Sequence, residues 1–106
     1  IAPVSLEDVV GDYLYINHGK DISSRMKTAV GITLNADGTI SGGASGVWHL
    51  VAEYFAHLEI EGELYKGVFV SQWDPSALAR VMTFTAVSDS GVAVWGKGHL
   101  REPGAP

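Results

Sequence analysis

The stretch from Leu64 to Trp95 places the strongest constraint on what this chain can fold into. Its first part, Leu64–Trp73, is dense in β-branched and aromatic residues, contains no proline, and lies between Glu61-Gly62 and Asp74-Pro75. This composition is typical of a long strand with a turn at each end. Two further runs of the same kind follow it directly, and they predict an antiparallel meander: Arg80–Val87 and Val92–Trp95.

The remainder of the chain repeats this pattern of short strands and turns. Asn35-Ala36-Asp37-Gly38 predicts a hairpin turn, closed by Gly38 at positive φ. Gly42-Gly43 predicts a break or bulge. Ser5, followed by acidic residues, predicts an N-capped helical turn. The predicted strands are residues 12–18, 27–34, 39–41, 45–51, 55–60, 64–73, 80–87 and 92–95.

Eight short strands at even spacing, with no long helix, indicate an all-β closed antiparallel barrel or a sandwich. We favour an eight-stranded meander barrel, because every connection is short and closure removes the exposed sheet edges. The 106 residues form one domain, residues 1–106, with its core in residues 8–97. Residues 21–25 are expected to form a loop, and residues 101–106 a loose tail.

Two hairpins are specific enough for a prediction of register. A hairpin centred near Glu53 places His49 opposite His57 and puts apolar residues on the other face: Trp48, Leu50, Leu58 and Ile60. A two-residue Ser90-Gly91 turn in the last hairpin puts another apolar set on one face, which we expect to be a core stripe: Met82, Phe84, Ala86, Ala93 and Trp95.

Charge and composition exclude several functions. The net charge is −5, and the seven Lys and Arg residues form no patch, so nucleic acid is not an expected partner. Cysteine is absent, which excludes disulfides and thiol chemistry. No apolar run approaches the roughly 20 residues of a membrane helix. The chain starts with Ile1 and shows no signal peptide, so we expect a processed product or a piece of a longer protein.

No residue set points to catalysis or to a metal site. Asp37, Glu61, Glu63, Asp74 and Asp89 fall at predicted turns, where acidic residues are ordinary, and nothing marks two of them as the carboxylate pair of a glycosidase.

The histidines do not form a site either. His49 and His57 lack a third ligand other than Glu59, so we expect an exposed cross-strand pair. We therefore expect no catalytic residues, no metal and no cofactor.

The aromatic residues of the strand 64–73 leave two alternatives open. A two-residue turn before this strand sends Tyr65, Phe69 and Trp73 into the barrel, whereas a three-residue turn leaves them as an exposed strip on which sugar rings could stack. Burial in the core is the better-supported alternative, because large aromatic side chains dominate small cores. We expect Trp73, at the end of the strand, to be partly exposed in either case. These three residues are the candidate carbohydrate-binding positions, with Trp73 first.

Six blocks of the sequence carry a resemblance to a known family. They are Gly-Asp-Tyr-Leu-Tyr-Ile-Asn-His-Gly-Lys-Asp (11–21), Ile-Thr-Leu-Asn-Ala-Asp-Gly-Thr-Ile-Ser-Gly (32–42), Gly-Val-Trp (46–48), Tyr-Lys-Gly-Val-Phe-Val-Ser-Gln-Trp-Asp (65–74), Val-Met-Thr-Phe-Thr-Ala (81–86) and Gly-Val-Ala-Val-Trp-Gly (91–96). Together they resemble the C-terminal β-barrel domain of bacterial family 43 glycoside hydrolases, the extracellular endo-α-1,5-arabinanases.

The resemblance implies a lipocalin-like barrel appended to a five-bladed catalytic propeller, in a secreted protein. The family's catalytic carboxylates and metal site lie in that propeller, and no residue of this chain corresponds to them. The resemblance thus implies a non-catalytic accessory domain that packs on the propeller, with contact to arabinan or arabino-oligosaccharide as a second expected role. The alternative is a free-standing lipocalin-like barrel that binds a small apolar ligand, since eight strands can enclose one.

Overall fold

The computed structural model describes residues 3–20, 28–76 and 78–99. The predicted loop at 21–25, the start of the predicted strand at Lys27 and the tail 101–106 lie outside these ranges. One helical turn precedes eight strands. The elements are α1 (Leu6–Val9), β1 (Gly11–Gly19), β2 (Val30–Leu34), β3 (Thr39–Gly42), β4 (Gly46–Ala52), β5 (Phe55–Ile60), β6 (Glu63–Asp74), β7 (Ala79–Ser88) and β8 (Ala93–His99).

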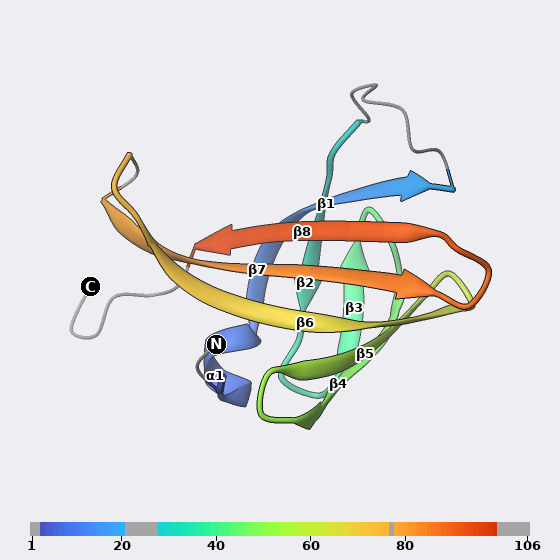
Figure 1. Ribbon diagram of the computed structural model, residues 1–106, viewed down its shortest axis with the longest axis horizontal. Helices are drawn as coiled ribbons and strands as arrows, with labels where there is room; N and C mark the ends of the chain where they lie inside the picture. The colour runs from blue at the N-terminus through green and yellow to red at the C-terminus, as the bar shows by residue number, and fades with distance from the viewer. Residues whose placement is uncertain (1–2, 21–27, 77, 100–106) are drawn as a thin grey trace.

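The eight strands form one closed antiparallel barrel in chain order, which confirms the predicted meander. Each strand pairs with the next, and β1 closes the sheet by pairing with β8, with Leu14 opposite Lys97 and Ile16 opposite Trp95. Figure 1 shows β6, β7 and β8 side by side, with β2 and β3 crossing behind them. Closure gives each described strand a paired neighbour on both sides.

The helical turn α1 packs at one end of the barrel. Ser5 is the N-cap, as predicted, and forms a capping box with Asp8, in which each side chain accepts a hydrogen bond from the other residue's backbone N–H. The Tyr13 hydroxyl donates to the Val9 carbonyl at 2.6 Å, and the Val4 N–H donates to the Glu53 carbonyl in the β4–β5 turn. These bonds hold the buried side chains of Val4 and Val9 against the core.

Aromatic rings fill the barrel interior. Phe69 and Phe84 are fully buried, with ring centroids 5.5 Å apart, and Tyr13 lies 6.4 Å from Phe69 and 5.7 Å from Phe84. The rings meet in tilted or edge-on geometry, as aromatic quadrupoles favour. Aliphatic side chains complete the core: Ile32, Leu34, Ile40, Leu58, Ile60, Met82 and Val94.

The turn before β6 has two residues, which settles the orientation of that strand. Glu61 and Gly62 both adopt positive φ, as a type I′ turn requires, and Ile60 pairs with Glu63. Leu58 therefore lies opposite Tyr65, and both point inward. The interior alternative is confirmed for Tyr65 and Phe69.

The predicted register of the β4–β5 hairpin is correct, whereas that of the β7–β8 hairpin is wrong. His49 pairs with His57 as expected. In the last hairpin the loop contains Asp89, Ser90 and Gly91. The Ser88 N–H donates to the Val92 carbonyl, the Gly91 N–H donates to the Ser88 carbonyl, and Gly91 takes φ 89°.

One extra loop residue shifts the register by one position and reverses the faces of β8. Val94 and Gly96 face inward opposite Ala86 and Phe84, while Ala93 and Trp95 point outward. Met82 also faces inward, so three of the five predicted stripe residues are in the core.

Strand β8 runs to His99, beyond the predicted end at Trp95. Glycines at 96 and 98 resemble strand breakers in the sequence, but each makes room for an aromatic ring. A Cβ at Gly96 would collide with the Phe84 ring, and a Cβ at Gly98 would lie 3.1 Å from the Tyr13 ring. Both glycines are thus places where a ring packs directly on the backbone.

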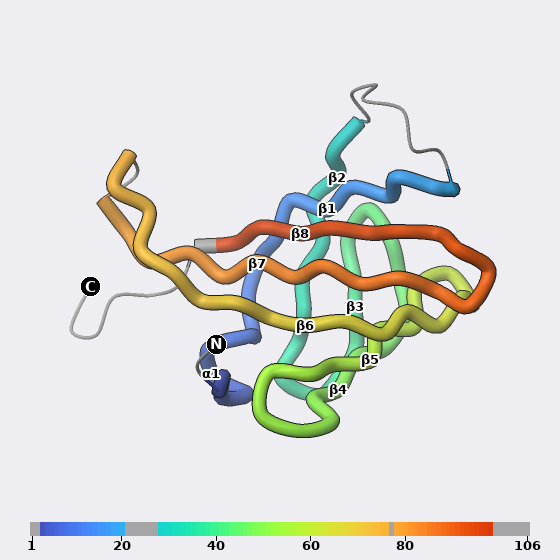
Figure 2. The backbone as a smooth tube through the Cα atoms, in the orientation of Figure 1, coloured from blue at the N-terminus to red at the C-terminus, as the bar shows by residue number. Residues whose placement is uncertain are grey.

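The β6–β7 hairpin extends past the barrel body (Figure 2). The pairing of β6 with β5 ends at Val68, and that of β7 with β8 ends at Val81. Beyond these points, Trp73 pairs only with Arg80, and Asp74 only with Ala79, among the described residues. This projecting hairpin positions the candidate site.

Candidate functional site

The three candidate carbohydrate-binding residues lie in two different environments. Tyr65 and Phe69 are 3% and 0% exposed in the barrel interior, so neither offers a ring face to solvent. Trp73 is 52% exposed on the projecting hairpin. The exposed strip of three aromatic rings is therefore absent, and Trp73 is the candidate that a ligand can reach.

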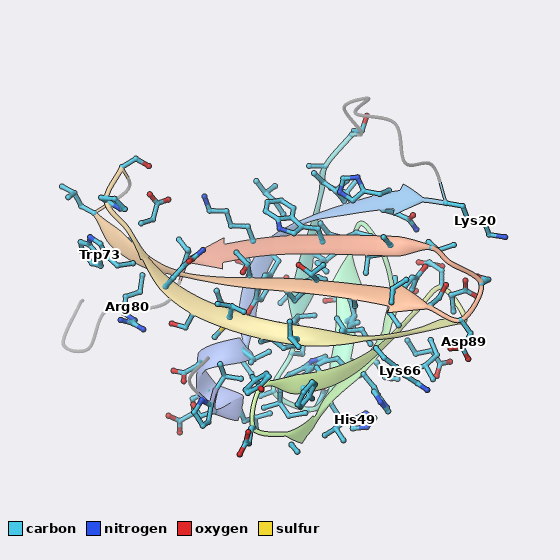
Figure 3. The ribbon with its side chains drawn as sticks, viewed as in Figure 1. Lys20, His49, Lys66, Trp73, Arg80 and Asp89 are labelled. Atoms are coloured by element: carbon cyan, nitrogen blue, oxygen red, sulfur yellow. The ribbon has the colours of Figure 1, made fainter. Side chains whose placement is uncertain are left out.

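Trp73 is exposed because the barrel ends before its position. Side chains alternate along β6, so Trp73 points to the same side of the strand as Tyr65 and Phe69. At position 73, however, the hairpin has left the barrel, and no opposite strand among the described residues covers the indole ring. Figure 3 shows Trp73 and Arg80 at this hairpin, away from the barrel body. Arg80 donates to the Ser71 hydroxyl at 2.8 Å, which ties the two strands together.

A shallow cleft of about 410 Å³ lies where the hairpin leaves the barrel. Two indole rings, an ion pair and short side chains line it: Trp73, Asp74, Val81, Thr83, Trp95 and Lys97. Trp95 lines the cleft because the observed register of the β7–β8 hairpin directs its side chain outward. The cleft is open to solvent and brings two indole rings and an ion pair together at one place on the surface.

Asp74 organises the polar side of this cleft. One carboxylate oxygen accepts from the Lys97 ammonium at 3.3 Å, and the other accepts from the Ser76 N–H and hydroxyl at 3.0 and 2.7 Å. Its side chain is 19% exposed and that of Lys97 is 41% exposed. The carboxylate therefore holds the turn after β6 and fixes the Lys97 head group at the cleft.

Asp37, Glu63 and Glu61, three of the other acidic residues at the predicted turns, accept hydrogen bonds. Asp37 accepts from the N–H and hydroxyl of Thr39, which lowers the pKa of this carboxyl. Hydrogen bonds from Ser90 and Ser88 lower the pKa of Glu63. Glu61 accepts from the Ser45 N–H at 2.8 Å. The lowered pKa values of Asp37 and Glu63 are opposite in direction to that of a general acid, whose pKa is raised.

The histidine pair lies on the outer wall of β4 and β5. The His49 and His57 ring centroids are 5.2 Å apart with an interplanar angle of 76°, and His49 is exposed. Within the described ranges, no three His, Asp or Glu side chains gather where they could hold a metal ion. No helix in the same ranges is long and apolar enough to cross a membrane.

Three tyrosine hydroxyls lie within or at the ends of the filled barrel. Burial, with a smaller effect of the Asp8 carboxylate, raises the pKa of Tyr13 well above its ordinary value. Burial, together with the neighbouring Tyr65 hydroxyl, raises the pKa of Tyr15 to about 12. Burial also raises the pKa of Tyr65. The folded protein therefore keeps these phenols neutral at pH values where the unfolded chain ionises them.

The free energy of unfolding is expected to fall as the pH rises from about 10 to about 12. In this window the unfolded chain releases phenolic protons that the folded protein retains, so alkali favours unfolding. Urea titrations at a series of alkaline pH values measure the decline, and Tyr15→Phe is expected to make it shallower. Phenolate absorbance that appears at the same pH in folded and unfolded protein would contradict this prediction.

Comparison with known proteins identifies a family. The model of the GH43_C family, described as a C-terminal lipocalin-like domain, matches residues 1–96. The extracellular endo-α-(1→5)-L-arabinanase of Thermotoga petrophila is 45% identical over 93 residues, which cover 85% of this chain and 20% of that protein. Extracellular endo-α-(1→5)-L-arabinanase 2 of Bacillus subtilis is 43% identical over 93 residues, covering 88% of this chain and 20% of that protein.

Solved structures agree with this match. The family 43 glycoside hydrolase YxiA of Bacillus licheniformis superposes with a TM-score of 0.84 at 43% identity, covering 92% of this chain and 22% of that one. The T. petrophila endo-1,5-α-L-arabinanase superposes with a TM-score of 0.82 at 42% identity, covering 96% and 23%. The chain thus spans about one fifth of the length of these relatives. It belongs to the GH43_C family of C-terminal lipocalin-like domains.

Proposed function

We propose that this chain is the accessory domain of a secreted arabinan-degrading glycoside hydrolase and packs on the catalytic domain of that enzyme. The observation that carries the proposal is the combination of family and coverage. The chain matches extracellular arabinanases at 43–45% identity, yet corresponds to only 20% of their length. The remaining four fifths of those proteins have no counterpart in these residues, and we assign catalysis to that part.

The filled interior supports this role over that of a free-standing ligand carrier. The rings of Tyr13, Phe69 and Phe84 occupy the space in which a lipocalin-like barrel would hold a small apolar molecule. The cleft at Trp73 lies outside the barrel wall. An eight-stranded barrel packed in this way acts as a rigid body that can present its outer surface to a partner.

The full-length product of the gene tests the proposal. We expect the reading frame that contains residues 1–106 to encode a hydrolase domain as well, and its product to release oligosaccharides from linear arabinan. Deletion of residues 1–106 is expected to lower the Tm of the catalytic domain by at least about 4 °C, because an interface that binds only the folded state stabilises it. A reading frame without a hydrolase domain, or an unchanged Tm, would count against the proposal.

A second role of the same domain is contact with polysaccharide through the Trp73 cleft. The half-exposed indole offers a flat apolar face, and the Asp74–Lys97 pair offers polar groups to sugar hydroxyls. Trp73→Ala is expected to weaken the binding of an arabino-oligosaccharide about tenfold, or about 1.4 kcal/mol, in isothermal titration calorimetry. Phe55→Ala is the matched control, because Phe55 is a 48% exposed aromatic residue at another hairpin. Equal affinity of both variants and the parent would refute the role of Trp73.

A further inference from the structure

The outer wall formed by β6, β7, β8 and β1 carries a row of apolar side chains that point outward. We call it the apolar outer face and define it by its outward apolar side chains: Val68, Val70, Val87, Trp95, Leu14 and Ile16. Leu14 and Val87 are 57% and 52% exposed, and the others are partly exposed.

The strand register makes this face continuous. One row runs from Val68 through Thr85 and Trp95 to Ile16, with Phe55 of β5 continuing it at the other end. The adjacent row contains Val70, Thr83, Lys97 and Leu14. Directly opposed residues in neighbouring strands contact one another, so these side chains form one surface.

The opposite wall of the barrel has a different character. The outward positions of β2 and β3 include Thr33, Thr39 and Ser41, and Asp12 accepts a hydrogen bond from Thr33 at 2.7 Å. A sheet with one face in water normally carries polar residues on that face. The wall of β2 and β3 follows this rule, and the apolar outer face departs from it. Contiguous exposed apolar surface in a soluble protein marks an interaction site.

Two lysine side chains bring charge to the apolar outer face, one at each end. Lys97 lies within it, but its ammonium is paired with Asp74 at the end near the projecting hairpin. Lys66 lies at the other end, opposite Val87. The described strands of the barrel are paired into a closed sheet, so a partner that docks on this wall packs against its side chains.

We propose that the apolar outer face is the surface on which the catalytic domain of the same polypeptide docks. This inference rests on the proposed function and adds the location of the interface, which borders the Trp73 cleft because Trp95 and Lys97 belong to both. We choose the catalytic domain as the partner because the relatives are longer proteins, in which four fifths of the chain lies outside the matched domain. A domain in the same chain is present at high effective concentration, so an interface of modest area suffices to hold it.

Cysteine labelling of the full-length polypeptide tests the location. The chain contains no cysteine, so a single introduced thiol in it reports on one position. Leu14→Cys and Val87→Cys probe the apolar outer face. Val47→Cys and Val51→Cys are matched controls, because these two residues of β4 are 49% and 52% exposed. Without a docked domain, all four thiols should react with maleimide at similar rates, measured by mass spectrometry of the labelled peptides.

We expect the thiols at positions 14 and 87 to react at least about tenfold more slowly than those at 47 and 51, because a face docked for nine tenths of the time is reactive for one tenth. Equal rates at all four positions, or slow labelling at 47 and 51 instead, would overturn the proposed location. Protection that disappears on dilution would assign the face to a second copy of the chain and would also overturn it. The proposed function fails separately, if the reading frame encodes no hydrolase domain.

Discussion

Replacement of Phe69 by alanine is expected to lower the free energy of unfolding of this domain by about 3–5 kcal/mol. Phe69 is fully buried and its ring packs between those of Tyr13 and Phe84, at centroid distances of 6.4 and 5.5 Å. Truncation removes the buried ring and leaves a cavity that neighbouring side chains on fixed strands cannot close. Since domains are stable by only about 5–15 kcal/mol, much of the stability would be lost.

Equilibrium denaturation in urea measures this loss. Leu64→Ala is the matched control, because Leu64 lies on the same strand, points outward and is 43% exposed. The control is expected to change the free energy of unfolding by no more than about 0.5 kcal/mol. A loss of less than about 1 kcal/mol in the Phe69 variant would show that the interior is not tightly packed.

Gly67→Ala is expected to destabilise the domain by about 2–3 kcal/mol through overpacking. A Cβ at this position would collide with the Thr85 carbonyl oxygen and would lie 2.6 Å from the Ala86 Cα. Both obstacles belong to the backbone of the paired strand β7, which cannot turn away as a side chain can. The neighbouring inward positions are Ala56 and Ala86, so small residues on three strands bring the walls of the barrel close together here.

Gly31→Ala is the control for this prediction. A Cβ at Gly31 has no atom within 4 Å and the backbone does not adopt positive φ, so alanine is expected to leave stability unchanged or to raise it by about 0.5 kcal/mol. The difference in midpoint between the two alanine variants, measured in the same denaturation series, reports the close approach of β6 and β7. Equal midpoints would contradict the geometry at Gly67.

Patterns within single hairpins predicted most of the fold. Gly38 does adopt positive φ at the predicted turn, and Glu61-Gly62 forms the two-residue turn that directs Tyr65 and Phe69 inward. The His49–His57 register followed from the polar and apolar alternation on both sides of Glu53. These features depend on residues close together in the chain, so their causes are visible in the sequence.

The β7–β8 hairpin shows where such reasoning fails. Two-residue and three-residue loops are both compatible with Asp89-Ser90-Gly91, and the choice between them reverses every side chain of β8. Packing decides it, because Phe84 needs a glycine opposite its ring, and Gly96 supplies that space only in the observed register. The error placed Trp95 in the core, and so the sequence did not reveal the cleft to which Trp95 contributes.

The sequence by itself determined that this chain forms eight antiparallel strands and where most of the turns lie, since alternation and turn chemistry act over a few residues. Only the tertiary structure decided that Trp73 lies beyond the barrel while Phe69 lies within it, although both share one side of β6. It also decided that outward residues from β6, β7, β8 and β1 meet on one wall. The physical reason is that exposure depends on what stands opposite a side chain, and strand lengths and barrel closure set this across the whole chain.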